Sequence, residues 1–170
     1  TTIAFSDAGN DSIHSDAGAD IVIAGRGTDT ITTGTDNQRD VVAGDNVTAV
    51  FTTNSDGRID TEKLTTITST DTSDSTTDTD TITTGAGSDV VIGGNATDTI
   101  HTNAGDDIVV GDNATAEIDV TVAGDGTVSY VLRELDSTAT DHGALDTIHT
   151  GEGADIVIGG IGDDTISTLL

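Results

Sequence analysis

The chain has 170 residues and carries 31 acidic side chains against 5 basic ones, which gives a formal net charge of −26 at pH 7. Such a polyanion repels nucleic acids and anionic membrane surfaces, so neither is expected as a partner, and cations are favoured instead. Aromatic residues make up only 2 % of the chain and Cys, Pro, Met and Trp are missing, so disulfides, thiolate metal sites and a core of ordinary bulk are excluded.

No apolar run approaches the roughly 18 residues that a membrane span needs. No basic and apolar leader precedes the first repeat either, so we expect no membrane insertion. The start at Thr1 without Met suggests a segment cut from a longer chain.

A nine-residue repeat runs through most of the chain, with Asp at its sixth place and an aliphatic residue at its eighth. Residues 6–32 read SDAGNDSIH, SDAGADIVI and AGRGTDTIT; residues 84–110 read TGAGSDVVI, GGNATDTIH and TNAGDDIVV; residues 150–167 read TGEGADIVI and GGIGDDTIS. The sixth-place aspartates are Asp11, Asp20, Asp29, Asp40, Asp80, Asp89, Asp98, Asp107, Asp146, Asp155 and Asp164.

Alternate repeats differ after the aspartate, because one kind continues with Thr-Ile or Ser-Ile and the other with Ile-Val or Val-Val. The structural unit is therefore 18 residues long. Three strand residues and a six-residue turn, used twice per unit, predict an all-β protein, a right-handed parallel β-roll of two sheets with coils about 4.8 Å apart. The eighth-place residues point inward and are the predicted core: Ile13, Val22, Ile31, Val42, Ile82, Val91, Ile100, Val109, Ile148, Val157 and Ile166.

Two inserts interrupt the repeat, at about residues 47–78 and 114–144, and each follows a Gly-Asp-Asn sequence. Each insert holds two strand-like stretches around Asp-Gly, which predicts a β-hairpin. The stretches are Ala49–Thr53, Arg58–Thr61, Glu117–Val122 and Thr127–Leu135. We expect one roll over residues 1–170, built from supermodules of about 66 residues with two coils and one hairpin each.

The seventh and ninth places point outward, and on one sheet they are apolar: Ile21, Ile23, Val41, Ala43, Val90, Ile92, Ile108, Val110, Ile156 and Ile158. An apolar stripe of this size requires a cover. We predict that the hairpins supply it through Phe51, Ile59, Ile118, Val120, Val122, Val128, Tyr130 and Leu132. A partner protein or self-association on this face is the alternative.

The other sheet presents a rank of hydroxyls, from Ser12, Thr30, Thr32, Thr81, Thr83, Thr99, Thr147 and Thr165. Such a regular array of hydroxyls could bind ice or a crystalline polysaccharide. Thr is, however, also an ordinary solvent-facing strand residue, so the array requires no ligand. His14, His101 and His149 share the ninth place on this face, and the last two are expected on neighbouring coils. Exposed histidines without a bound ligand are favoured over a zinc site there, because the repeat spacing places no third metal ligand beside them.

With two inward side chains per coil, apolar burial does not offset the entropy of ordering the turns. A hard divalent cation supplies the missing stabilisation, because it takes six to eight oxygens from carboxylates and backbone carbonyls. Two stacked turns then share one ion, most clearly at Asp89/Asp107, Asp107/Asp155, Asp80/Asp98 and Asp146/Asp164. Weaker pairs are expected where an insert or the expansion at Thr35–Arg39 intervenes: Asp20/Asp40, Asp11/Asp29, Asp29/Asp80, Asp40/Asp89 and Asp98/Asp146.

The candidate ligands are the eleven aspartates together with turn carbonyls, since Gly at the second and fourth places allows φ > 0. The candidate glycines are Gly18, Gly25, Gly27, Gly85, Gly87, Gly93, Gly105, Gly111, Gly151, Gly153, Gly159 and Gly162. Asp7, Asp16, Asp45 and Asp112 stand where the second Gly is usual, and Ala96 stands at a fourth place. These turns are expected to be strained or to gain a carboxylate.

The nonapeptides resemble the GGxGxDxUx repeats of the RTX (repeats-in-toxin) calcium-binding family over roughly two thirds of the chain. The resemblance implies several bound Ca²⁺ ions, held by turn carbonyls and the sixth-place Asp, at residues such as Gly85, Gly87, Asp89 and Gly93. It also implies a chain that leaves a Gram-negative cell unfolded through a type I secretion channel and folds on meeting external calcium.

The favoured function is a calcium-stiffened extender segment of a giant secreted, cell-surface, adhesin-like protein. The alternatives are a secretion and folding module of an RTX enzyme or toxin, and an ice- or glycan-binding module that uses the Thr-rich face. Neighbouring repeats of the same chain or a surface ligand are the expected partners besides calcium. Catalysis is not expected, because the aspartates recur identically at every turn and no nucleophile elbow, HExxH motif or phosphate loop occurs.

Overall fold

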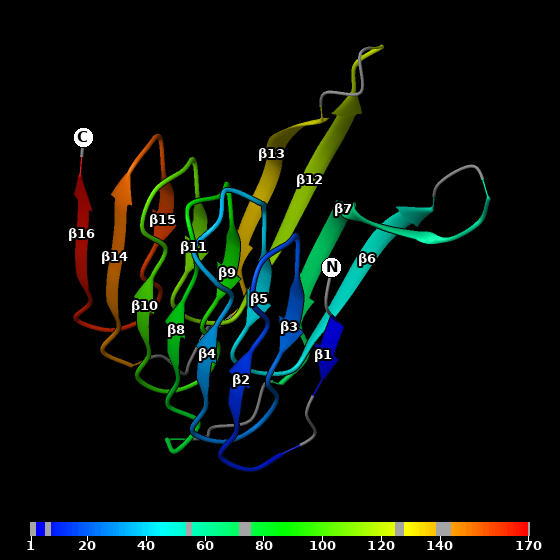
Figure 1. Cartoon of the computed structure of the whole chain (residues 1–170). Coiled ribbons are helices and arrows are strands. Elements are labelled where there is room, and N and C mark those ends of the chain that lie inside the picture. The colour runs from blue at the N-terminus through cyan, green and yellow to red at the C-terminus, as the bar shows by residue number, and fades with distance from the viewer. Residues whose placement is uncertain are drawn as a thin grey trace.

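The computed structural model describes residues 3–5, 8–53, 56–71, 76–124, 128–138 and 144–169. In Figure 1 the short strands of the roll stand in two facing rows, and the long strands of the inserts lie behind them and project beyond the roll. None of the described residues belongs to a helix that could cross a bilayer.

The apolar sheet is parallel throughout and contains, in spatial order, β1 (Ile3–Phe5), β3 (Ile21–Ile23), β5 (Val41–Ala43), β9 (Val90–Ile92), β11 (Ile108–Val110) and β15 (Ile156–Ile158). The threonine sheet is also parallel and contains β16 (Thr165–Leu169), β14 (Thr147–Glu152), β10 (Thr99–His101), β8 (Thr81–Thr83), β4 (Thr30–Thr32) and β2 (Ser12–His14).

Equal places of the repeat lie opposite one another in both sheets, as at Ile31↔Ile82 and Ile100↔Ile148. This register confirms the parallel β-roll with two strands per 18-residue coil. The strand β1 was not predicted, because Thr2 stands where an aspartate precedes the other strands of the apolar sheet.

The inner core lies between the two sheets and consists of the predicted eighth-place residues. Val22, Ile31, Val42, Ile82, Val91, Ile100, Val109 and Ile148 are buried, and Ile13 and Val157 pack against them. The prediction is wrong for Ile166, whose residue is 46 % exposed. It lies on β16, the last strand of the threonine sheet, which has a described neighbour on one side only.

The two inserts form one antiparallel sheet, here called the insert sheet, in the order β13-β12-β7-β6. Its strands are β6 (Val47–Thr53), β7 (Ile59–Ser69), β12 (Ala114–Val122) and β13 (Val128–Ser137). The two hairpins were predicted, but the pairing of β7 with β12 was not. It joins separate supermodules through Thr66–Thr68 and Thr115–Glu117. The Asp125-Gly126 turn and Thr127 lie outside the described residues.

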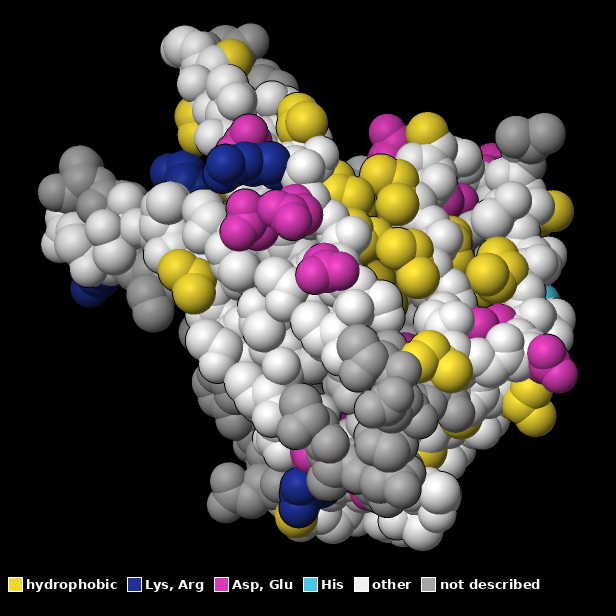
Figure 2. Space-filling view, turned by 180° about the vertical axis from the view of Figure 1, so that it is seen from behind, with side chains coloured by type: hydrophobic (Ala, Val, Ile, Leu, Met, Phe, Trp, Pro, Cys, Tyr) yellow, Lys and Arg dark blue, Asp and Glu magenta, His cyan; other side chains and the backbone are white. Residues whose placement is uncertain are grey.

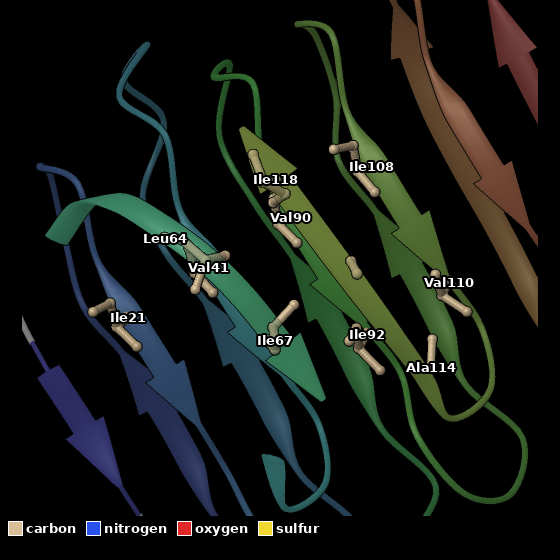
Figure 3. Close-up of a cluster of buried hydrophobic side chains, with 11 residues drawn as sticks. Ile21, Val41, Leu64, Ile67, Val90, Ile92, Ile108, Val110, Ala114 and Ile118 are labelled. Atoms are coloured by element: carbon tan, nitrogen blue, oxygen red, sulfur yellow. The ribbon is translucent and has the colours of Figure 1, made fainter. Parts of the chain in front are cut away.

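The insert sheet covers the outer face of the apolar sheet, which confirms the predicted cover. Figure 3 shows the second core, in which Ile21, Val41, Val90, Ile92, Ile108 and Val110 meet Leu64, Ile67, Ala114 and Ile118. Phe51, Val120, Tyr130 and Leu132 pack against it. The buried contacts of Leu64, Ile67 and Ala114 were missed, because the predicted strands began too late or ended too early.

Two details of this prediction are wrong. Val122 is 48 % exposed, since it lies at the end of β12 that projects beyond the roll in Figure 1. Ile156, on the last strand of the apolar sheet, is 42 % exposed and not covered. The side chains of Ile59 and Val128 lie outside the described part of the molecule.

Candidate metal centre

The turns that connect the two sheets stack along two edges of the roll. Turns that leave the apolar sheet begin with a small residue, and their stack is here called the glycine edge: Ala24, Gly44, Gly93, Gly111 and Gly159. Turns that leave the threonine sheet begin with a hydroxyl residue, and their stack is the hydroxyl edge: Ser15, Thr33, Thr84, Thr102 and Thr150.

A ladder of aspartates follows each edge, because the backbone N–H of each sixth-place Asp donates to Oδ1 of the next Asp in the stack. On the glycine edge the ladder joins Asp11, Asp29, Asp80, Asp98, Asp146 and Asp164, with distances of 2.7, 2.9, 2.8, 2.8 and 3.0 Å. On the hydroxyl edge it joins Asp20, Asp40, Asp89, Asp107 and Asp155, with distances of 2.9, 2.8, 2.9 and 3.1 Å. The structure therefore stacks all eleven predicted aspartates in two rows.

The second carboxylate oxygen of most inner rungs has no hydrogen-bond donor. Among the described residues this holds for the buried Oδ2 atoms of Asp29, Asp80, Asp89, Asp98, Asp107 and Asp146. A buried polar atom without a partner is costly, and an ionised carboxylate only accepts hydrogen bonds. A proton or a bound cation would satisfy these oxygens.

On the glycine edge these oxygens point at the backbone of the first-place glycines. A β-carbon added to Gly93 would lie 2.4 Å from Oδ2 of Asp98 and 2.3 Å from the carbonyl oxygen of Gly111. One added to Gly111 would lie 2.2 Å from Oδ2 of Asp146 and 2.4 Å from the carbonyl oxygen of Gly159. A carboxylate oxygen and a carbonyl oxygen thus converge beside each glycine, in space that only a residue without a side chain leaves open.

Burial of the ladder aspartates disfavours their ionised form. It raises the pKa of Asp80 to about 8 and that of Asp146 to about 7, and neighbouring carboxylates add to both rises. Burial also raises the pKa of Asp98 well above its ordinary value, with the charges of Asp80 and Asp146 in addition. The backbone N–H groups offset only part of this effect. A bound cation would relieve both the burial and the repulsion.

The hydroxyl edge places a threonine hydroxyl near each of three carboxylates, Asp89, Asp107 and Asp155. Burial raises the pKa of Asp89 to about 7 and that of Asp107 to about 6, and the hydroxyls of Thr84 and Thr102 limit these rises. Both hydroxyls also reach the carbonyl of the next coil at 3.4 Å. The Thr150 hydroxyl donates directly to Oδ2 of Asp155 at 2.5 Å. The glycine edge is therefore the less satisfied of the two.

The Gly-Asp-Asn sequences attach each insert to the next coil. Oδ2 of Asp45 accepts a hydrogen bond from the backbone N–H of Asn95 at 2.6 Å, and Oδ2 of Asp112 accepts one from Ile161 at 2.5 Å. Oδ1 of both aspartates is buried without a hydrogen-bond partner. These second-place aspartates therefore bring an additional carboxylate to the glycine edge, at positions where the sequence allowed either strain or a carboxylate.

In most of the turns without a second-place Asp45 or Asp112, the residue at the second or fourth place has a left-handed backbone with positive φ. Asp16 has φ 61° and Ala96 has φ 66°, as expected for strained substitutions, whereas Asp7 lies outside the described residues. Of the candidate glycines, the left-handed ones are Gly18, Gly25, Gly27, Gly105, Gly151, Gly153 and Gly162. The others, Gly85, Gly87, Gly93, Gly111 and Gly159, are not left-handed. At these positions neighbouring atoms lie too close to leave room for a β-carbon.

Within the described ranges no three His, Asp or Glu side chains converge on one point. Any cation must therefore take backbone oxygens as well as carboxylates, which is the ligand chemistry of calcium. The rings of His101 and His149 stack with centroids 5.0 Å apart on neighbouring strands, as their shared place predicted.

Residues 3–37, 74–113 and 144–168 match the RTX calcium-binding nonapeptide repeat, in four copies. The chain belongs to the RTX calcium-binding repeat family. No curated protein and no solved structure matches it. RTX repeats bind several Ca²⁺ ions and typically occur in secreted proteins, and the repeat is a structural one. The matched ranges contain most of both RTX ladders and leave out the strands of the insert sheet.

The ladders of this RTX chain fit calcium on their own geometry. Six buried carboxylate oxygens lack a donor, and those of Asp80, Asp98 and Asp146 lie beside backbone carbonyl oxygens, where a methyl group added to the neighbouring glycine would clash. A hard cation that takes both kinds of oxygen satisfies them together.

Proposed function

We propose that this chain is a calcium-binding extender module of a large secreted protein, and that it folds when calcium binds after export. The observation that carries the proposal is the glycine-edge ladder, whose four inner aspartates, Asp29, Asp80, Asp98 and Asp146, each have a buried carboxylate oxygen without a donor. Calcium supplies positive charge to these oxygens when bound.

The proposed ligands are the eleven sixth-place aspartates and the carbonyls of the twelve candidate glycines named above. On the glycine edge, Oδ2 of Asp98 with the carbonyl of Gly111, and Oδ2 of Asp146 with the carbonyl of Gly159, would hold ions. On the hydroxyl edge, Asp89 and Asp107 are the proposed pair, as the sequence favoured.

Mass action makes folding depend on the compartment. With a site constant near 10⁻⁴ M and millimolar external calcium, each occupied site stabilises the fold by about 1.4 kcal/mol. Several sites in one cooperative roll then decide whether the polyanion folds. In a cytoplasm with far less free calcium the same sites contribute almost nothing, so the chain stays unfolded and fit for export.

The insert sheet supports the extender role, because it braces several coils at once along one side of the roll. We treat residues 1–170 as one roll segment with inserts at about 47–78 and 114–144. We place it at the surface of a Gram-negative bacterium, in an adhesin-like protein exported by type I secretion, and we assign it no catalysis. A folding module of an RTX enzyme or toxin is the second context that this chemistry serves.

Calcium titration tests the proposal directly. Circular dichroism should show little strand signal in chelator and a cooperative rise with calcium, while native mass spectrometry counts the bound ions. Magnesium at the same concentration is the control, since it requires a smaller, near-octahedral site and should restore much less structure. Equal strand content in chelator and in calcium would refute calcium-coupled folding.

One observation favours a second function for the threonine sheet. Its seventh-place hydroxyls lie in register across six parallel strands, in the order Ser12, Thr30, Thr81, Thr99, Thr147 and Thr165. Such a rank could match a periodic surface of ice or polysaccharide. Thermal hysteresis or glycan-array binding that Thr83→Tyr abolishes and Thr121→Tyr, on the insert sheet, preserves would support this function.

A further inference from the structure

The cover over the apolar sheet stops before its last strand. The seventh-place residues Ile21, Val41, Val90, Ile108 and Ile156 lie in register on neighbouring strands. Their exposed fractions are 3, 2, 1, 9 and 42 %, so burial ends abruptly at β15. Figure 2 shows hydrophobic side chains gathered on this face beside the projecting inserts.

A pocket of about 410 Å³ lies between β13 and the uncovered part of the apolar sheet. Tyr130 and Leu132 form one wall, and Ile108 and Ile156 belong to the apolar sheet opposite. The guanidinium of Arg39, which also lines the pocket, lies 3.6 Å from the ring centroid of Tyr130. Asp106 and Asp107 belong to the lining as well, so this groove combines apolar walls with charged groups.

The edge of β13 beside this groove is open. In the described part of the chain β13 pairs with β12 alone, whereas β12 pairs with both β13 and β7. The open edge offers unpaired backbone groups next to the apolar side chains of Ile108 and Ile156, which is a usual setting for strand addition.

The contact between the two existing inserts supplies the register for an added strand. The inserts are equivalent, because Val47 pairs with Ser69 in the first and Ala114 pairs with Ser137 in the second. Thr66–Thr68 of β7 therefore correspond to Glu134–Asp136 of β13. The former segment pairs with β12, and its Ile67 is fully buried, whereas the equivalent Leu135 is only partly buried.

We propose that this groove docks a third insert hairpin, carried by a further coil stacked on β15 and β16, whose first strand pairs antiparallel with β13. The residue opposite Leu135 is apolar, and those opposite Glu134 and Asp136 are uncharged or basic, because like charges directly opposite destabilise a sheet. The sequence Thr48-Ala49-Val50 of the first insert meets this requirement. The proposal goes beyond the extender role, since it names the surface through which successive supermodules lock together.

An extended chain tests the proposal. It consists of residues 1–167 followed by copies of residues 102–113 and 47–70, which add one strand of the apolar sheet and one insert. The copies contain no tyrosine, so Tyr130 remains the only one. In calcium, hydrogen exchange at the free-edge amides of β13 should slow at least tenfold, and quenching of Tyr130 fluorescence by acrylamide should fall about twofold.

Two matched variants locate the contact. Serine at Phe51, Leu64 and Ile67 of the copy should abolish the protection of β13. Val50→Glu in the copy, which faces Glu134, should weaken it, and Glu134→Lys should restore it. Rescue by the opposite charge reports the register and not merely a folded extension.

Three results would overturn the proposal: β13 exchange that is equal in the extended and original chains, an extension that exchanges fast throughout, or slow β13 exchange in an original chain that has dimerised. The last result would assign the groove to a second copy. Calcium titration of the original chain by circular dichroism is unaffected by these outcomes, so a failed docking leaves calcium-coupled folding to be judged separately.

Discussion

The backbone N–H of Asp98 donates a 2.8 Å hydrogen bond to Oδ1 of Asp146, although 48 positions and the whole second insert separate them. Asp29 and Asp80 are joined in the same way across the first insert, at 2.9 Å. Each insert closes on itself at its base, where Thr70 donates to the Asn46 carbonyl at 2.8 Å and Thr138 to that of Asn113 at 2.9 Å. The inserts therefore do not break the ladder, and the pairs expected to be weaker stack like the others.

Replacing Asp98 by Asn should change stability in opposite directions with and without calcium. The carboxylate lies between two neighbouring rungs, so its loss removes up to two ion sites, worth about 3 kcal/mol together at millimolar calcium. In chelator the neutral amide relieves a buried charge, so the small strand content that remains should stay equal or rise. Urea denaturation in calcium measures the loss of stability, and circular dichroism in chelator measures the strand content.

Asp163→Asn is the matched control for this substitution, since Asp163 is exposed and lies next to the ladder residue Asp164. It should change the free energy of unfolding in calcium by no more than about 0.5 kcal/mol and leave the strand content in chelator unchanged. A loss of strand content in chelator at Asp98→Asn, alongside the loss of stability in calcium, would contradict the assignment of the ladder to calcium.

Gly93→Ala should weaken calcium binding more than any change in backbone propensity explains. The new methyl group would lie 2.3 Å from the Gly111 carbonyl oxygen and 2.4 Å from Oδ2 of Asp98, so both oxygens must move. We expect at least one ion fewer by native mass spectrometry and a higher calcium midpoint. Gly124→Ala, where an added β-carbon meets nothing within 4 Å, should leave both unchanged.

Without calcium, the roll should be more stable at pH 5 than at pH 8. Burial raises the pKa of Asp80 to about 8 and those of Asp89 and Asp146 to about 7 in the folded chain, against about 3.9 when unfolded. The folded state thus binds more protons between these limits, and its stability falls as pH rises through them. Circular dichroism in chelator at both pH values checks the sign, because the strand content should be higher at pH 5. A roll that is more stable at pH 8 would show that the ladder is not desolvated.

Ile118→Ala should destabilise the calcium-loaded roll by about 2–4 kcal/mol, because Ile118 is 3 % exposed in the core between the insert and apolar sheets. Val122→Ala on the same strand should cost less than about 0.5 kcal/mol, since Val122 is 48 % exposed. Urea denaturation in calcium measures both. Equal losses would mean that the insert sheet does not rest on the roll as described.

The sequence predicted the roll well because its signals are local. The period of nine, the sixth-place Asp and the eighth-place aliphatic each act within one turn and one strand, so Val91, Ile100 and Val109 were placed in the core without knowledge of their neighbours. The first-place residues, such as Gly93 and Thr84, also carry a local signal that distinguishes the glycine edge from the hydroxyl edge.

The sequence by itself determined the repeat, the two sheets, the apolar and hydroxyl faces and the acidic turns, since each follows from spacing along a few neighbouring residues. Only the tertiary structure decided that the ladders cross the inserts with the same spacing as elsewhere, that β7 pairs with β12, and that Ile156 is left uncovered. Those features depend on how far each hairpin reaches over the stacked coils and on which segments meet there. Residue spacing does not determine which strands of the two inserts meet, because these strands lie outside the repeat and can return to the roll in more than one register.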